Sequence, residues 1–385
     1  MNPVIERAER RQEVRDAARQ WAAGKHIDAA TRSLIEAAYP DDRHRFTGTF
    51  RVVAFGAAAF AAVSSFALLL LAARPREGRG AGLLALGFAV VLVATTEYLR
   101  GPLRWLHAGA ETATALLAGL AGQFGLLLLL FGDSFGDGKD FLRVLAGLGV
   151  VLFAALVWRY GMASAAAIAM GYLGLLLTQF PAARWSWILA ALLLGALAFR
   201  GQEEARLAPS LRLACSVVLG MALAGLYLAV NLFGWDRQLF ESGGWAPLPL
   251  RAVFIAATAL LPLAVLFWGV ACRSRLLLSC GLLLAAASLV TVRQYWHLAP
   301  TWALLTAGGA LLIALALGVR RWLAGGPAGE RGGFTAQPLR GEEGGGLAET
   351  AVALVIVPPQ PAPDTRGEFA GEGGRSGGAG ASDTW

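Results

Sequence analysis

The chain has 385 residues, of which 56% are hydrophobic and only 15% are charged. Soluble domains carry about 25% charged residues, so this composition excludes one large soluble core and is typical of a protein that crosses the bilayer many times. The formal net charge is +7. Many of the arginines flank apolar segments, where they orient membrane helices, so we expect no nucleic-acid partner.

Residues 1–51 are hydrophilic and predict a cytoplasmic amphipathic helical hairpin. Asp28 is the expected N-cap of the second helix, which Pro40 ends. The apolar residues at helical spacing are Val4, Ala8, Val14, Ala17, Ala18 and Trp21 in the first helix and Ala30, Leu34, Ile35 and Ala38 in the second. Two short helices bury too little surface to stand alone. We therefore expect the hairpin to pack on the membrane face, on a protein partner or on its own copy.

Ten apolar segments follow, each with a length suited to a membrane helix, which needs about 20 apolar residues. The predicted spans are residues 52–73, 81–99, 110–131, 142–158, 161–180, 185–199, 213–234, 252–272, 276–292 and 301–319. The fourth and sixth are expected to be short. The predicted fold is all-α: a polytopic transmembrane helical bundle over residues 52–322, whose lipid bilayer is its first partner.

Basic residues near the ends of the spans predict the orientation. The numbers of arginines in the loops on the two sides of the membrane are nearly equal. The arginines that flank the first and last spans therefore indicate the orientation. They are Arg32, Arg43, Arg45 and Arg51 before the first span, and Arg320 and Arg321 after the last. We expect a multi-pass protein of the cell inner (plasma) membrane with both termini in the cytoplasm. The first apolar segment begins near Val52, after too long a hydrophilic segment for a signal peptide.

Residues 323–385 are rich in glycine and proline and predict a disordered tail, because they cannot bury enough apolar surface to offset the entropy of ordering. The tail contains one apolar island, residues 351–357, which is too short to span a membrane. A protein partner is expected to bind through the N-terminal hairpin or through this tail.

The N-terminal segment carries a resemblance. The residues concerned are Trp21 through Asp28, with Ile35, Asp41, Asp42, Arg43 and Arg51 ahead of the first predicted span. This pattern resembles the N-terminus of an uncharacterised family of bacterial predicted membrane proteins, and the ten-span layout is similar to theirs. The resemblance implies a multi-pass membrane protein with a short N-terminal helical hairpin. It implies no activity, because none is assigned to that family.

Ionisable residues inside spans are functional candidates, since each costs about 2.5–3.5 kcal/mol at the bilayer centre. Glu97 lies near the end of the second span, and Glu111 follows His107 by one helical turn at the start of the third. One interpretation is a cluster of Glu97, His107 and Glu111 that handles protons or cations. The other is interfacial: Glu97 pairs with Arg100 or Arg104, and Glu111 favours the first turn of its helix. We expect Glu111 to face the bundle interior.

Pro262 lies centrally in the eighth span and is a candidate helix kink. Transporters often bind substrate at broken helices near the midplane. The sequence contains no recognisable nucleotide-binding, zinc-protease or serine-hydrolase motif. It therefore predicts no catalytic residue, cofactor or metal site.

Three functions remain open. The sequence favours a non-enzymatic membrane scaffold or accessory component, because the span centres lack charges and the hairpin and tail suit partner binding. The alternative is a transporter of a neutral or lipophilic solute, indicated by the ten segments and Pro262. An intramembrane enzyme acting on lipid would need a carboxylate pair, for which only Glu97 and Glu111 qualify.

Overall fold

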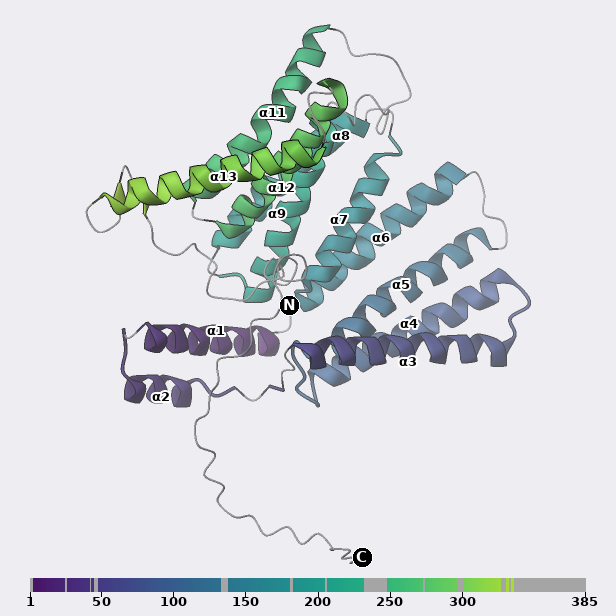
Figure 1. Cartoon of the computed structure of the whole chain (residues 1–385). Coiled ribbons are helices and arrows are strands. Elements are labelled where there is room, and N and C mark those ends of the chain that lie inside the picture. Colours follow the sequence, from purple (N-terminus) through teal and green to yellow (C-terminus); the bar gives the residue numbers. More distant parts are fainter. Residues whose placement is uncertain are drawn as a thin grey trace, which may run out of the picture. The chain divides into compact units, whose positions relative to one another are not determined.

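The structure is a computed structural model of the whole chain (Figure 1). It describes residues 3–24, 26–41, 43–44, 48–132, 138–180, 183–204, 206–231, 248–272, 274–296, 301–326, 330–331 and 334–335. The chain divides into two units, Met1–Gly344 and Gly345–Trp385, and every described residue belongs to the first. The predicted tail from residue 336 onward, with its apolar island, lies outside the described residues, as do Asp42 and Arg45.

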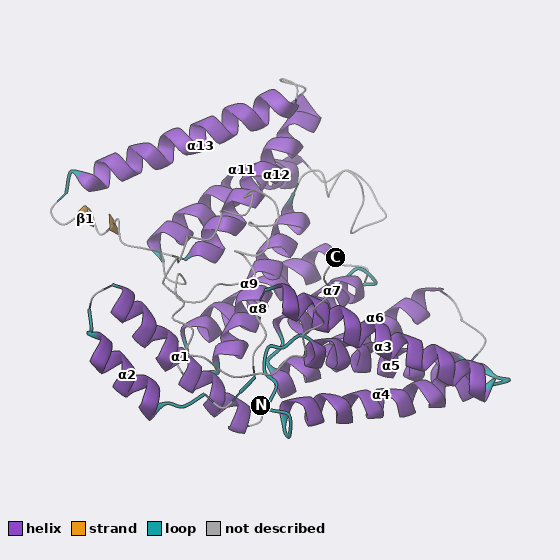
Figure 2. Ribbon diagram, turned by 60° about the horizontal axis from the view of Figure 1, so that its bottom comes forward, coloured by secondary structure: helices purple, strands orange, loops and turns teal. Residues whose placement is uncertain are grey.

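The described chain is helical apart from short loops and one small strand pair (Figure 2), which confirms the predicted all-α membrane fold. The helices are α1 (Pro3–Ala23), α2 (Ala29–Ala38), α3 (Thr49–Ala73), α4 (Gly78–Arg100), α5 (Ala110–Phe131), α6 (Gly138–Tyr160), α7 (Ala163–Leu177), α8 (Ala183–Glu203), α9 (Pro209–Val230), α11 (Leu248–Ala271), α12 (Arg275–Trp296) and α13 (Thr301–Ala324). Strand β1 (Glu330–Arg331) pairs antiparallel with β2 (Phe334–Thr335).

Each of the ten predicted spans coincides with one helix from α3 to α13. Within the described residues, seven helices are long and apolar enough to cross a membrane: α3, α4, α5, α6, α8, α9 and α11. The apolar helix α7 has 15 residues, or about 22 Å at 1.5 Å per residue, which is less than the hydrocarbon core of about 30 Å. The protein is therefore an integral membrane protein, and the count of ten spans stays a prediction.

The expectation of a short fourth and a short sixth span is wrong. The fourth is α6, with 23 residues, and the sixth is α8, with 21. Both helices continue through the charged residues that bound their apolar cores, such as Arg143 and Arg159 in α6 and Glu203 in α8. Long basic side chains keep their charged heads in water while their stems stay in the apolar layer. Counting apolar residues alone therefore underestimated these two helices.

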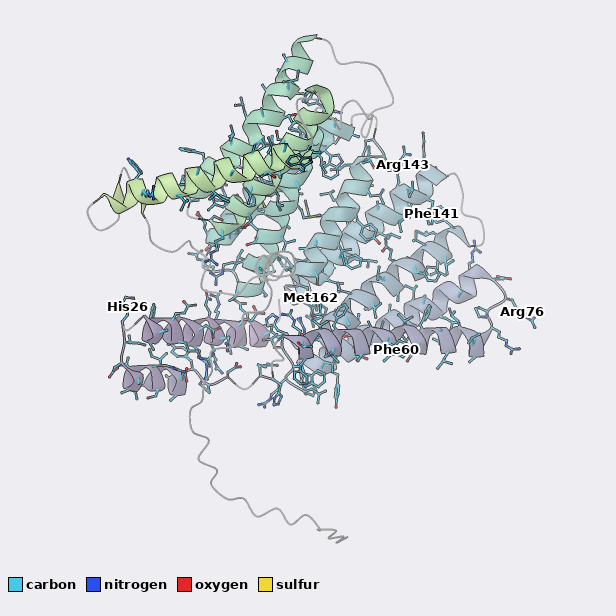
Figure 3. All side chains as sticks on the ribbon, viewed as in Figure 1. His26, Phe60, Arg76, Phe141, Arg143 and Met162 are labelled. Atoms are coloured by element: carbon cyan, nitrogen blue, oxygen red, sulfur yellow. The ribbon has the colours of Figure 1, made fainter. Side chains whose placement is uncertain are left out.

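Helices that follow one another in the chain pack in pairs: α4 with α5, α6 with α7, α8 with α9, and α11 with α12 (Figure 1). Figure 3 places Arg76 at the turn between α3 and α4 and Met162 at the turn between α6 and α7. Helix α5 also contacts α3 and α6, while α9 also contacts α7, α11 and α12. Helices α5 and α9 are consequently the two spans around which their neighbours pack.

Glycines allow the closest of these contacts. A Cβ atom on Gly125 of α5 would lie 2.8 Å from the carbonyl oxygen of Gly82 in α4, and one on Gly82 would lie 2.9 Å from the carbonyl oxygen of Gly125. The two backbones therefore touch directly, as small residues permit in membrane helices. Farther along the chain, the Trp187 ring of α8 fills the space beside Gly174 of α7 and Gly225 of α9.

The N-terminal helices form the predicted hairpin, with His26 at its turn (Figure 3). The Asp28 N-cap is confirmed, because its carboxylate accepts the Thr31 N–H at 2.9 Å. Hydrogen bonds from the side chain and the backbone of Thr31 lower the pKa of Asp28. The predicted apolar stripe of α2 is not buried, since no residue of α2 is buried and Leu34 is 71% exposed. The reason is that the hairpin contacts the spans through α1 rather than through α2.

Candidate functional site

Buried charges gather where α1 meets the ends of α4, α5 and α9. We call Glu9 of α1, Arg100 of α4, His107 of the α4–α5 loop and Glu111 of α5 the charge cluster. Glu9, Arg100 and Glu111 are each at most 4% exposed. Burying a charge costs several kcal/mol unless it is paired and hydrogen-bonded, so these side chains need one another.

Glu111 faces the bundle interior, as predicted, and is fully buried. Its Oε1 accepts the N–H of Ala108 at 2.9 Å. Gly109 precedes the helix with φ of +100°, and a Cβ there would collide with the carbonyl oxygen of Arg51. Glycine at this position thus lets the α4–α5 loop approach the start of α3 closely. The Glu111 carboxylate lies within hydrogen-bond distance of the same loop. Within the described chain, Glu111 Oε2 accepts no hydrogen bond.

Arg100 is the last residue of α4 and is buried rather than interfacial. Its Nη1 donates to the Tyr160 carbonyl at 3.1 Å, and its guanidinium carbon lies 4.9 Å from the centroid of the Tyr160 ring. Among the acidic residues, its charge interacts most strongly with Glu111 and next with Glu9. Arg100 is therefore the cation that compensates two buried carboxylates.

Glu97 has different partners from those expected. Its Oε1 accepts hydrogen bonds from Arg159 Nε and from the Tyr160 hydroxyl, both at 3.0 Å, and Arg159 Nη2 lies at 2.9 Å. Pairing with Arg100 or Arg104 is therefore wrong. Arg100 points to the buried side of α4, whereas Glu97 remains one-third exposed and faces the end of α6.

The predicted trio of Glu97, His107 and Glu111 is thus divided among different partners. Glu97 binds Arg159, Glu111 binds the Ala108 amide, and His107 Nε2 lies 3.9 Å from Glu9 Oε1. Glu9 and Arg100 connect His107 and Glu111 within the charge cluster.

Glu9 was missed by sequence reasoning. It is 4% exposed, and its Oε2 accepts the backbone N–H of Ser210 at 3.2 Å. Ser210 is in the first turn of α9, whose own N-cap residue, Ala208, has no side-chain acceptor. The Glu9 carboxylate therefore caps α9 from another helix and lies at the positive end of its dipole. In the sequence Glu9 is one of many charges in a hydrophilic helix, and no local pattern distinguishes it.

The charge cluster is built to hold elements together. Its carboxylates interact with a guanidinium, an imidazole and backbone amides, and no serine or cysteine nucleophile is among its members. Across the described residues, no group of three histidine, cysteine, aspartate or glutamate side chains is arranged to hold a metal ion. The arrangement suits an interlock between α1 and the spans.

A second, uncharged polar group surrounds Pro262, which is less than 2% exposed in α11. Proline has no N–H, so the Thr258 carbonyl one turn earlier loses its intrahelical donor. The Ser288 hydroxyl of α12 donates to that carbonyl at 2.9 Å. Nearby, Asn231 Nδ2 donates to Thr291 Oγ1 at 3.0 Å. We call Thr258, Pro262, Ser288, Asn231 and Thr291 the proline cluster.

Arg184, which immediately precedes the predicted span 185–199, is 1% exposed at the start of α8. Its Nη1 donates to the Ala229 carbonyl at 3.1 Å, and its guanidinium carbon lies 5.3 Å from the centroid of the Phe254 ring. These contacts join α8, α9 and α11. A small apolar cleft lies close by, between α7 and α8 and beside Ala222 of α9.

Comparison of the chain with models of protein families, with curated proteins and with solved structures found no match. The resemblance of the N-terminal segment to a bacterial family therefore stays a prediction. Function has to be argued from the contacts of the described residues.

Proposed function

We propose that the protein is a non-enzymatic membrane scaffold or accessory component. In this proposal the spans hold the α1–α2 hairpin in place, and α2 binds a protein partner. The observation that carries the proposal is a contrast between the two helices: α1 is fixed to the membrane domain by a buried carboxylate, whereas α2 buries none of its residues.

The attachment of α1 to the start of α9 supports a rigid hairpin. Besides the bond between Glu9 and Ser210, Glu13 pairs with Arg212 and Arg10 donates to the Arg206 carbonyl. A hairpin already held in one orientation loses less entropy when a partner binds it.

Helix α2 is in turn tied to α1 by charged side chains. Arg15 Nη1 donates to the carbonyls of Glu36 and Tyr39, both at 3.1 Å. Arg19 of α1 binds the Glu36 carboxylate at 3.2 Å, and Arg32 of α2 itself binds the same carboxylate at 3.1 Å. These contacts leave Leu34 and Tyr39 exposed, by 71% and 42%. Exposed apolar and aromatic side chains among charges are the composition of a protein-binding surface.

Purification in native lipid with two matched variants tests the proposal. We expect a stoichiometric protein partner to copurify with the wild type and with Leu103→Asp, which changes an exposed leucine of the α4–α5 loop. The same partner should be lost from Leu34→Asp. Equal recovery from both variants, or recovery of lipid alone with the wild type, would contradict the proposal.

We place the protein in the cell inner (plasma) membrane with both termini in the cytoplasm. Arg51 in the first turn of α3 and Arg321 in the last turn of α13 support this orientation. The hairpin would then meet a cytoplasmic partner.

The second candidate function is transport of a neutral or lipophilic solute. The proline cluster favours it, because uncharged polar groups beside a proline-interrupted helix resemble the setting in which transporters bind substrate. A small molecule that copurifies with the wild type but not with Asn231→Ala would favour transport over the scaffold.

A further inference from the structure

We propose that α1 is a latch that sets the spacing between two groups of spans at the end where the hairpin docks. The first group is α3, α4 and α5, and the second is α8, α9, α11 and α12. This inference goes beyond the scaffold function and needs no partner, because it concerns only contacts within the chain.

The latch contacts the first group through the loop between α4 and α5. Leu106 of this loop is 1% exposed and packs against Ile5 and Ala8 of α1, which are also buried. The next residue, His107, places its Nε2 3.9 Å from Glu9 Oε1. Apolar and polar contacts to the same loop thus lie on adjacent turns of α1.

The latch contacts the second group through the connection between α8 and α9. Arg10 donates to the Arg206 carbonyl, Glu9 accepts from the Ser210 amide, and Glu13 pairs with Arg212. These partners lie within one short segment that leads into α9. One face of α1 therefore bridges the two loops.

Glu9 makes the two attachments interdependent. Its carboxylate is 4% exposed and is faced by His107 from the loop, by the Ser210 amide from α9, and by the charge of Arg100 from α4. Glu111 shares Arg100 with it. Removing one partner from a buried charge leaves an uncompensated charge, which is strongly destabilising. Separation of either group from α1 therefore weakens the hold on the other.

The segment after α2 reinforces the same loop. Arg43 Nη1 donates to the Arg100 carbonyl at 2.6 Å, and the His44 N–H donates to the Arg104 carbonyl at 3.0 Å. The backbone carbonyl of His44 accepts a hydrogen bond from the Leu106 N–H at 3.0 Å. Both ends of the hairpin are thus fixed to the α4–α5 loop, so a displacement of the hairpin is transmitted to the first group.

Opening of the latch changes spacing without dissociating the bundle. Helices α6 and α7 lie between the two groups in sequence and contact both, through α5 on one side and α9 on the other. This connection persists when α1 is released. Motion is therefore expected mainly at the ends of the helices that α1 bridges.

Pulsed electron–electron distance measurement on the full chain in lipid nanodiscs tests the latch. Spin labels at Leu103→Cys and Glu204→Cys mark the two loops, both at exposed positions, after Cys215, Cys272 and Cys280 are replaced by serine. We expect Glu9→Gln to shift the distance distribution to longer values. Asp16→Asn, which removes an exposed pair with Arg19 on the same helix, should leave the distribution unchanged.

An unchanged distribution for folded Glu9→Gln would overturn the latch. If Glu9→Gln does not accumulate as a folded protein, the double variant Ile5→Ala and Leu106→Ala provides the same test, since it weakens only the apolar attachment. An unchanged distribution for that folded variant also overturns the proposal. No partner is present in this measurement, so its failure is distinguishable from failure of the scaffold function.

Discussion

The Ser288 hydroxyl donates a hydrogen bond to the Thr258 carbonyl, across the contact between α12 and α11. The carbonyl is available because Pro262 provides no N–H one turn later. A helix interruption within one span is therefore satisfied by a side chain from its neighbour, as membrane helices require.

This relationship predicts a coupled pair of substitutions. Ser288→Ala should destabilise the protein by about 0.6–1.7 kcal/mol, the measured scale of hydrogen bonds between membrane helices. In a Pro262→Ala background the restored amide at position 262 satisfies Thr258, so Ser288→Ala should cost much less. Unfolding by a denaturing detergent measures the free energy of unfolding of the wild type, the two single variants and the double variant, which together form a double-mutant cycle. Ser279→Ala, whose hydroxyl bonds only within α12, is the control, and additive effects of Pro262→Ala and Ser288→Ala would contradict the interpretation.

Glu111→Gln and Glu97→Gln should differ sharply in stability. Glu111→Gln leaves the buried Arg100 without one of the two buried carboxylates that compensate its charge, and should cost about 3–5 kcal/mol, the scale for a buried charge that loses its partner. Glu97→Gln affects a partly exposed pair with Arg159 and should cost about 0–1 kcal/mol. Thermal unfolding in one detergent compares them. Similar losses would mean that Arg100 depends little on Glu111.

Gly125→Ala should destabilise the pairing of α4 with α5. The added Cβ would lie 2.8 Å from the Gly82 carbonyl oxygen, so the backbones must separate, at a cost of about 1–3 kcal/mol for overpacking. Gly87→Ala on α4 is the matched control, since nothing lies within 4 Å of its new Cβ. It should be neutral or stabilising by up to about 1 kcal/mol through helix propensity. Detergent unfolding that ranks Gly125→Ala equal to Gly87→Ala would refute the close contact.

Stability of α2 should fall at acidic pH. Hydrogen bonds from Thr31 lower the pKa of Asp28, and hydrogen bonds from Arg32 and Arg19 lower that of Glu36. A carboxylate with a lowered folded pKa stabilises the fold above its unfolded pKa, and this contribution is lost as the pH falls through the folded pKa. Amide exchange of residues 29–38, corrected for its intrinsic pH dependence, should accelerate below the ordinary pKa values of 3.8 and 4.5.

Asp28→Asn separates the two carboxylates in that experiment. Asparagine is as good an N-cap as aspartate but does not titrate. The variant should therefore keep the protection of α2 at neutral pH and show a weaker acid response. An acid response of wild-type size would assign the whole effect to Glu36.

Reporter fusions test the topology. An even number of spans after a cytoplasmic N-terminus returns the chain to the cytoplasm, so a cytoplasm-only reporter fused after Ala324 should be active. A periplasm-only reporter active at the same site would indicate an odd number of spans or the opposite orientation. Because α7 has only 15 residues, a second fusion in the turn that follows it shows whether this helix crosses.

The helices were predictable because their signals are local. Long apolar segments specify spans, and Asp28 two residues after the turn specifies the start of α2. The inward direction of Glu111 was also predicted correctly. A charged side chain in an apolar span is costly where it contacts lipid. The lengths of α6 and α8 were underestimated because charged residues extend helices beyond their apolar cores.

The partners of Glu9 and of Glu97 were not predictable from one sequence. Glu9 bonds to Ser210, and Glu97 bonds to Arg159 rather than to an arginine on its own helix. These pairs depend on which helix ends lie side by side, and that is decided by packing among many spans. Arg184 illustrates the same limit: its loop-like position in the sequence gave no sign that α9 and α11 would enclose it.

The distance in sequence between Glu9 and Ser210 also determines the order of steps in the assembly of the protein. The two residues are 201 positions apart, and ribosomes add about 5–20 residues per second, so about 10–40 seconds pass between their syntheses. During this interval the α3–α5 spans enter the bilayer while α1 has no α9 to cap. Docking of α1 onto α9 is therefore one of the later steps of assembly. A chain that stalls before α9 would leave the Glu9 carboxylate without the Ser210 amide, and the hairpin would be held only by the α4–α5 loop.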